Sequence, residues 1–379
     1  MKRELNIVAI SDVHVGCPRI DPNALHDRFI KYLYPHLNQQ VDILFICGDF
    51  FDSLLTLNSL ASLVCLNIIG ELKDICKTND IDLRILRGTY THDRDQPAHF
   101  VNGEDPNATW IKLFNKVDLE YNEKTGLNIL YIPDNVATSD IYADIRKILD
   151  AHGVGRADIL IHHGYFKHML PQNIREPSGC LDADLINKYV KGCVLNGHVH
   201  LSSIYRNVLS IGSFERMVHG EEGAKGFFKI RIDTESVYHF EFVENKEASK
   251  FLTYDMRTFG NMAAEAISFF TRKWDDDICR FREGEKVRVR FISDDESIVE
   301  GCSSVAREKW PGTIIDKVNA VKREQILENV NTSLDELPVL TPDNLGEMML
   351  PLVQKTRPDM TLQEIQDILE LCKDPKKEA

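Results

Sequence analysis

The sequence has no apolar run that approaches the roughly 18 residues needed to cross a bilayer. Its first ten residues lead directly into an expected strand, without the apolar core and small-residue cleavage site of a secretory signal. None of its nine cysteines is spaced as Cys-x-x-Cys, and their number is odd. These absences argue against membrane spans and a disulfide framework, and they predict a cytoplasmic protein with reduced cysteines.

An excess of positive charge is also absent. The chain carries 45 Lys and Arg against 59 Asp and Glu, which gives a net charge of −14. A negative total disfavours tight, unaided binding to nucleic acid. Cations bound by carboxylates invert the local field, however, so the total does not exclude nuclease chemistry.

Buried strands alternate with helical patterns through the first 200 of the 379 residues. Short runs rich in Ile, Leu and Val are typical of strands covered on both faces. The expected strands are Asn6–Ser11, Ile43–Cys47, Asp82–Arg87, Asn128–Ile132, Asp158–Ile161 and Cys193–Leu195. The expected helices are Asn23–Leu37, Asn58–Lys77, Asn107–Phe114 and Ile141–His152. This alternation predicts a layered α/β domain.

The pattern changes after residue 200. Antiparallel strands at Ile204–Ile211, Phe227–Ile232 and Val237–Val243 are expected to complete a first domain at 1–250. A smaller unit at 251–322 would hold a helix at Asn261–Arg272, an acidic turn at 275–277 and an alternating strand with one basic face at Lys286–Phe291. A polar linker follows at 323–340. Helix-capping signals at Thr341-Pro342 and Thr361 to Glu364 predict short helices within 341–379 that dock or bind a partner.

Five short motifs carry the chemistry, and each follows or ends an apolar run. They are Asp12-Val13-His14, Gly48-Asp49-Phe50-Phe51-Asp52, Thr91-His92-Asp93, His162-His163-Gly164 and Gly197-His198-Val199-His200. Each motif alone has an ordinary explanation as a polar loop, a helix N-cap or a packing histidine. Together, at successive strand ends, they predict a cleft that holds two metal ions and hydrolyses phosphoesters.

The residue types suggest how such a cleft would work. The two oxygens of Asp49 suit a bridge between two cations, while Asp52 would orient a ligand or a water. Strand alternation lets only one of His162 and His163 ligate easily, and we favour His163. His92 would assist the leaving oxygen, and Asp93 would fix its tautomer. Mixed nitrogen and oxygen ligands suit Mn²⁺, Fe or Zn²⁺ better than Ca²⁺.

In these motifs the chain resembles the calcineurin-like metallophosphoesterases over roughly residues 5–245. Gly48 to Asp52, Gly212-Ser213-Phe214-Glu215-Arg216 and the run Gly220 to Phe227 are similar to the nuclease subunit of SbcCD-type DNA repair complexes, a layout shared by phage recombination nucleases. The resemblance implies a two-sheet β-sandwich flanked by helices, a small α+β capping domain that binds DNA, and C-terminal helices that bind an SMC-like coiled-coil ATPase. It also implies a homodimer, with the host cytoplasm as location if a phage encodes the chain.

The resemblance also implies site roles. Asp12, His14, Asp49 and His200 would hold one metal, while Asp49, His163 and His198 would hold the other, and His92 would act on the leaving group. The expected cofactor is two Mn²⁺, with Mg²⁺, Fe or Zn²⁺ as alternatives. The expected activity is that of a 3′–5′ exonuclease and single-strand endonuclease acting on DNA.

One motif departs from the family pattern. The family usually has Gly-Asn-His-Asp, where the asparagine oxygen binds a metal, but this chain has Gly88-Thr89-Tyr90-Thr91-His92-Asp93. Thr91, the backbone or a water would then replace the missing ligand. Two other functions stay open: a phosphatase or cyclic-nucleotide phosphodiesterase with the same site, and a degenerate subunit that only scaffolds a partner.

Overall fold

The computed structural model describes residues 3–56, 58–134, 140–170, 176–177, 179–283, 285–316 and 361. Residues Met1–Lys317 form one compact unit and Val318–Ala379 a second. The expected linker at 323–340 and the expected tail helices at 341–379 therefore lie outside the described residues, apart from Thr361. Among the described residues, no helix combines the length and apolar character that a bilayer span requires.

Two mixed six-stranded sheets form the larger part of the first unit. The first has the order β12-β11-β1-β2-β3-β4, with β1 to β4 parallel and with β11 and β12 antiparallel to their neighbours. Its strands are β1 Leu5–Ile10, β2 Ile43–Cys47, β3 Asp82–Leu86, β4 Ile111–Phe114, β11 Gly226–Ile232 and β12 Tyr238–Glu244.

The second sheet has the order β5-β6-β7-β8-β10-β9, with β6, β7, β8 and β10 parallel and with both edge strands antiparallel. Its strands are β5 Asp118–Asn122, β6 Leu127–Ile132, β7 Ile159–His163, β8 Val194–Gly197, β9 Ser203–Tyr205 and β10 Val208–Ser210. The parallel strands of both sheets are short and almost fully buried, as expected for strands with both faces covered.

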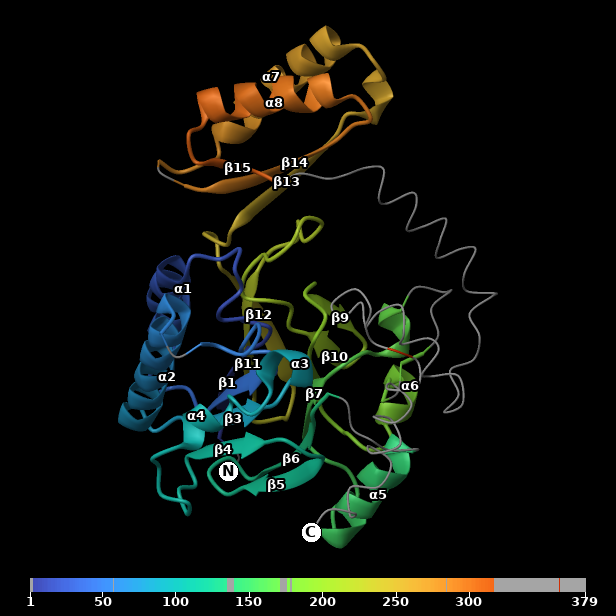
Figure 1. Cartoon of the computed structure of the whole chain (residues 1–379). Helices are drawn as coiled ribbons and strands as arrows, with labels where there is room; N and C mark the ends of the chain where they lie inside the picture. Colours follow the sequence, from blue (N-terminus) through green and yellow to red (C-terminus); the bar gives the residue numbers. More distant parts are fainter. Residues whose placement is uncertain are drawn as a thin grey trace. The chain divides into compact units, whose positions relative to one another are not determined.

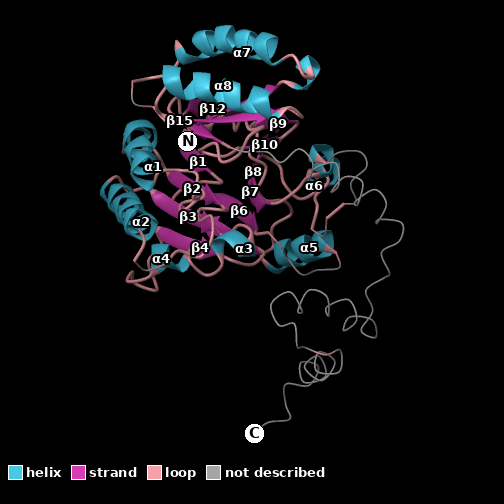
Figure 2. Ribbon diagram, turned by 45° about the horizontal axis from the view of Figure 1, so that its top comes forward, coloured by secondary structure: helices cyan, strands magenta, loops and turns pink. Residues whose placement is uncertain are grey.

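The two sheets pack face to face and carry helices on their outer faces. Alternate residues of β1 separate the layers: Ile7 and Ala9 join a core shared with the second sheet, while Val8 and Ile10 pack toward the helices. Figures 1 and 2 show α1 and α2 beside one sheet and α5 and α6 beside the other. The fold is thus α/β, with two mixed sheets between helices, which agrees with the expected two-sheet arrangement at that level.

The helices of these layers begin at residues that cap them. Asp21, Ser59 and Asp140 each accept a hydrogen bond from a backbone N–H in the first turn of the helix that follows. The helices are α1 Pro22–Arg28, continued by a π-helix at Phe29–Leu33 and a 3₁₀-helix at Tyr34–His36, then α2 Leu60–Thr78, α3 Tyr90–Asp93, α4 Ala98–Val101, α5 Ile141–Ala151, a 3₁₀-helix at Lys167–Met169 and α6 Ala183–Ile186.

The smaller part of the first unit has its own hydrophobic core. The parallel strands β13 Lys250–Asp255, β14 Val287–Ile292 and β15 Thr313–Ile315 form a three-stranded sheet. A 3₁₀-helix at Arg257–Phe259 follows β13, and the helices α7 Ala263–Ile278 and α8 Glu296–Lys309 join the strands into one cluster around Trp274 and Phe270. In β14 the residues Val287, Val289 and Phe291 are buried, so the expected alternation is confirmed.

Three sequence expectations about elements are wrong. Asn107–Phe114 is not a helix, because Ile111–Phe114 pairs with β3 as an edge strand. The acidic run at 275–277 is not a turn but the end of α7, where Lys309 and the Tyr254 hydroxyl hold its carboxylates. Ile204–Ile211 is two strands rather than one, since Arg206 turns the chain with a φ of 55°.

A buried charge network ties the edge of the first sheet to the second. The Arg84 side chain is 2% exposed, and its Nε donates to Glu120 Oε2 at 2.9 Å. Tyr131 also donates to Glu120, and Lys112 pairs with its other oxygen. Burial alone would raise the pKa of Glu120, but Arg84 and Lys112 together hold that pKa below its ordinary 4.5.

We expect Glu120→Gln to lower the free energy of unfolding by about 1.5–3 kcal/mol at neutral pH, because the buried Arg84 would lose one of its two carboxylate partners and keep only Asp82. The Glu120 pKa is lower in the folded state, so its contribution is present above about pH 4.5 and is lost as the pH falls below it. Urea unfolding at pH 7 and pH 4 measures both effects. The exposed neighbour Glu123, changed to Gln, is the control, and equal stability of the two variants at pH 7 would contradict this.

Candidate metal centre

The predicted ligands all lie at the carboxyl ends of neighbouring parallel strands. Asp12 and His14 follow β1, and Asp49 follows β2. His163 is the last residue of β7, while His198 and His200 follow β8. Because parallel strands end at one edge of a sheet, and the two sheets face each other, these side chains meet in two clusters: Asp12, His14 and His200 in the first, and Asp49, His163 and His198 in the second.

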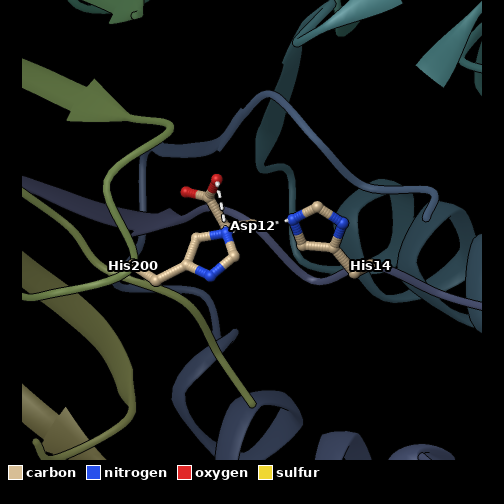
Figure 3. A group of neighbouring side chains, drawn as sticks. All are labelled: Asp12, His14 and His200. Atoms are coloured by element: carbon tan, nitrogen blue, oxygen red, sulfur yellow. Dashed lines mark hydrogen bonds and ion pairs between the residues drawn. The ribbon is translucent and has the colours of Figure 1, made fainter. Parts of the chain in front are cut away.

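The first cluster presents three donor atoms to one another (Figure 3). His200 Nε2 lies 3.2 Å from His14 Nε2 and 3.7 Å from Asp12 Oδ1. His200 Nδ1 bonds to Glu221 Oε1 at 2.6 Å. In the neutral ring Nδ1 is then the protonated nitrogen, so Nε2 presents a lone pair to the Asp12 carboxylate. Lone pairs that face each other in this way favour a positive charge between them, as a proton or as a metal ion.

The second cluster shows the same arrangement around a completely buried histidine. His163 is completely buried, and its Nδ1 bonds to the carbonyl oxygen of Cys47 at 2.7 Å. Its Nε2 lies 3.2 Å from Asp49 Oδ2, yet makes no hydrogen bond. Burial lowers the pKa of His163, but the charge of Asp49 outweighs this effect and raises the pKa well above its ordinary value. A positive charge is therefore favoured at this nitrogen, as a proton or as a metal ion.

One oxygen of Asp49 faces both clusters. Asp49 Oδ2 is 3.2 Å from His163 Nε2 and 3.9 Å from His14 Nε2. The side chain is 3% exposed, so burial would raise its pKa, but the neighbouring histidines reverse that shift and lower it. An ionised, buried carboxylate between two sets of histidine nitrogens is placed to bridge two cations.

Predicted ligands make up four of the eight described non-glycine residues that have a positive φ. Four of the six predicted ligands adopt the left-handed region, with φ of 51° at Asp12, 51° at His14, 48° at Asp49 and 81° at His198. Non-glycine residues are rare in this region, and each costs of the order of 1–3 kcal/mol. Such strain clusters at functional sites, where the surrounding structure holds it in place.

Residues outside the predicted ligand set position the first cluster. Glu221 bonds to His200 Nδ1, and its other oxygen pairs with the buried Lys225 at 3.2 Å. Burial would raise the pKa of Glu221, but its hydrogen bond with His200 helps lower it to about 2. The backbone N–H of His198 donates to both oxygens of Asp12. Glu221 lies in the run Gly220 to Phe227, which contributed to the resemblance, but the sequence did not indicate that Glu221 would position a histidine.

The structure corrects the expected role of Asp93. His92 Nδ1 bonds to the backbone oxygen of Asp52 rather than to Asp93. Asp93 is completely buried and accepts from the backbone N–H groups of Asp49, Phe51 and Gly88. Burial, and then the charge of Asp49, raise the pKa of Asp93 to about 6. Asp93 thus holds the ligand loops together and does not fix the His92 tautomer.

His92 and Asp52 lie against the first cluster. The ring of His92 meets that of His14 edge to face, with centroids 4.8 Å apart. Asp52 Oδ1 is 3.6 Å from His14 Nδ1, so Asp52 contacts a ligand with its carboxylate and His92 with its backbone. His162 stays apart from the clusters: its Nδ1 bonds to Asn196 Oδ1, and burial lowers its pKa to about 3.

Thr89, not Thr91, places its hydroxyl beside the second cluster. Its hydroxyl is 3.2 Å from Asp49 Oδ2 and 3.4 Å from His198 Nδ1, and its backbone N–H donates to Asp49 Oδ1. Thr91 is exposed in α3. The two added residues therefore lie after the ligand position, and Thr89 supplies an oxygen beside the second cluster.

We expect Thr89→Ala to weaken binding of the second divalent ion by about 10-fold, the lower end of what the loss of a neighbouring support group costs. The alanine keeps the backbone bond to Asp49 but removes the hydroxyl beside Asp49 and His198. Calorimetric titration with Mn²⁺ measures this affinity. The exposed Thr91, changed to Ala, is the control, and a loss confined to that control would contradict the assignment.

These donors fit divalent transition ions. Both clusters combine imidazole nitrogen with carboxylate oxygen, a set that suits Mn²⁺, Fe and Zn²⁺ rather than a calcium site built from oxygen alone. The buried Nε2 of His163 has no hydrogen-bond partner, as expected of a ligand atom, whereas the unpartnered Nδ1 of His14 faces Asp52 and not the first cluster. The donor set does not distinguish among these metals.

Comparisons with known proteins do not identify the function of this site. No family model matches the chain, and no curated protein matches its sequence. A solved crystal structure, whose description names no function, matches at 12% identity over 64% of this chain and 100% of its own, with a TM-score of 0.36. A likeness at that level carries no argument about fold or function.

Proposed function

We propose that the chain is a metal-dependent phosphodiesterase that cleaves DNA, with the fold and function of the metallophosphoesterase nuclease subunits it resembles. The observation that carries this proposal is the pair of histidine and aspartate clusters that share Asp49. Two cations held there would supply Lewis-acid activation of a phosphodiester and a lowered pKa for the attacking water. We propose Mn²⁺ as the cofactor, as the resemblance implies.

The chain's own residues would divide the remaining work. Asp49 and the strained loops after β1, β2 and β8 fix the donor atoms before substrate arrives. Glu221 holds His200 in the tautomer that presents Nε2. His92, anchored through Nδ1 to Asp52, keeps Nε2 to hold a proton and pass it to the leaving sugar oxygen.

A comparison of two substrates tests the proposed reaction. With Mn²⁺ present, we propose that the protein cleaves a labelled DNA duplex from its ends and nicks single strands, and that it hydrolyses p-nitrophenyl phosphate poorly. Rapid hydrolysis of the small ester without DNA cleavage would favour the phosphatase alternative. Binding of no Mn²⁺ would leave the scaffold alternative.

Partners of the chain are also a proposal. The resemblance implies a homodimer, and an apolar face near the start of α2 supports one. Leu54, Leu60, Leu63 and Leu66 are each more than half exposed there. Leu60, Leu63 and Leu66 recur at every third residue of α2, so they share one side of the helix, and exposed apolar side chains grouped in this way are typical of an interaction site.

Removing residues after Arg323 is expected to separate cleavage from ATPase binding. All six proposed metal ligands lie before residue 201, so metal-dependent cleavage should persist within about twofold. The capping signals that suggest partner helices lie within 341–379, so pull-down of a coiled-coil ATPase should be lost. Pull-down at the level of the full chain would contradict the role proposed for the tail.

A further inference from the structure

A cavity of about 200 Å³ lies beside the second cluster and shares two residues with it. His163 and His198 line this cavity as well as the proposed metal position. We call it the side cavity. A phosphate held between the clusters would therefore have the side cavity next to it, within reach of whatever group the phosphate carries.

The walls of the side cavity suit a flat apolar ring. Ile132 and Pro133, at the end of β6, and Ile141, at the start of α5, supply apolar surface. Tyr165 also lines the cavity, is 37% exposed, and meets His198 at 4.4 Å between ring centroids with the rings at 87°. The volume lies below the roughly 300–1,000 Å³ of pockets for drug-sized ligands, so it matches a single ring system.

Hydrogen-bond acceptors face the same space. Asn196 Nδ2 donates to the carbonyl oxygen of Gly164 at 3.2 Å, so Asn196 Oδ1 is left to accept from His162 Nδ1. His162 Nε2 is then an acceptor. A Cβ added to Gly164 would lie 3.0 Å from His162 Nε2 and 3.9 Å from Asp134 Oδ1, so both acceptors flank this glycine at the cavity wall.

We propose that the side cavity binds the nucleobase of the nucleotide whose phosphate the two clusters hold, with Tyr165 as the stacking residue. The inference rests on the proposed function and deepens it. Bases offer a π-face to Tyr165 and ring-edge N–H groups to His162. A sugar phosphate without a base fits the metal clusters equally well but leaves the side cavity unused.

Binding of two probes to the full chain saturated with Mn²⁺ tests this inference. The probes are deoxyadenosine 5′-monophosphate and 2-deoxyribose 5-phosphate, which differ only in the base. Stacking of a base on an aromatic side chain corresponds to a gain of about tenfold or more in affinity. We expect calorimetry to show that gain for the nucleotide, with Tyr165→Ala removing it and Tyr165→Phe keeping it.

Controls separate the base site from general damage. Tyr121→Ala removes an exposed tyrosine of the edge strand β5 and should leave both affinities unchanged. Tyr165→Ala should leave the affinity for 2-deoxyribose 5-phosphate unchanged. Equal binding of both probes to the unaltered protein overturns the inference, and so does an equal loss of both in Tyr165→Ala.

Different results refute the base site and the phosphodiesterase activity. If Mn²⁺ and 2-deoxyribose 5-phosphate bind but the nucleotide has no advantage, the base site is refuted and the proposed phosphodiesterase survives. If the titration shows no Mn²⁺ bound, both are refuted together.

Discussion

Asp49→Ala is expected to lower Mn²⁺-dependent DNA cleavage by at least about 10³-fold, the upper end of the loss seen when one preorganised electrostatic group is removed. A single oxygen of Asp49 faces His14 in one cluster and His163 in the other. Its removal therefore affects both proposed metal positions, which no other ligand substitution does. Steady-state cleavage rates and an Mn²⁺ titration measure the two consequences, and the number of bound ions should fall from two.

The matched control for this variant is Asp80→Ala. Asp80 also has a left-handed φ, 55° against 48° at Asp49, so alanine causes comparable backbone strain at both positions. Its side chain is 93% exposed and pairs with Lys124. Activity near that of the unaltered protein is expected for Asp80→Ala. Full activity in Asp49→Ala would remove the bridging role.

His92→Ala is expected to keep both metal ions and to lower the cleavage rate by about 10²–10⁴-fold, the usual contribution of a general acid. His92 lies against His14 but is bound through Nδ1 to the backbone of Asp52, which leaves its Nε2 for proton transfer. The loss should shrink when the DNA carries a leaving group that needs no proton, because the step that His92 assists then becomes easy.

The exposed His99 in α4, changed to Ala, controls for the loss of an imidazole elsewhere on the surface. A second comparison distinguishes acid catalysis from ligation. If His92→Ala loses an ion in the Mn²⁺ titration, His92 is a ligand and the proton-transfer role is wrong. Its ring would then bind an ion together with His14 and Asp52, since one potential ligand atom from each of these three residues lies within 4.8 Å of the others.

The layered fold and the convergence of the six predicted ligands followed from local patterns. Apolar runs such as Ile43–Cys47 are buried on both faces, so their composition alone identifies them as strands. A polar residue directly after such a run lies at the edge of the sheet wherever the strand pairs. For that reason Asp12, Asp49 and His163 could be grouped without knowing the strand order.

What the sequence could not predict depends on contacts between distant residues. Ile111–Phe114 becomes a strand only because β3 offers it an edge, whereas its local pattern also fits a helix turn. Asp93 follows His92 directly, yet its carboxylate turns to three backbone N–H groups of other loops. Its position next to His92 in the sequence therefore did not predict the hydrogen-bond partners of Asp93.

The position of the Thr89 hydroxyl also could not be predicted from the sequence. Sequence comparison with the family motif counted two added residues but could not say on which side of the ligand position they lay. The short helix Tyr90–Asp93 takes up the extra length after Thr89. The oxygen beside Asp49 and His198 is thus supplied one residue after Gly88, where the family motif has its asparagine.

Anomalous scattering from a crystal soaked in Mn²⁺ counts the bound ions and identifies their ligands in one experiment. We expect two peaks, one among Asp12, His14 and His200 and one between His163 and His198, with the Asp49 carboxylate in contact with both. A single peak, an ion that does not touch Asp49, or no peak under saturating Mn²⁺ would contradict it.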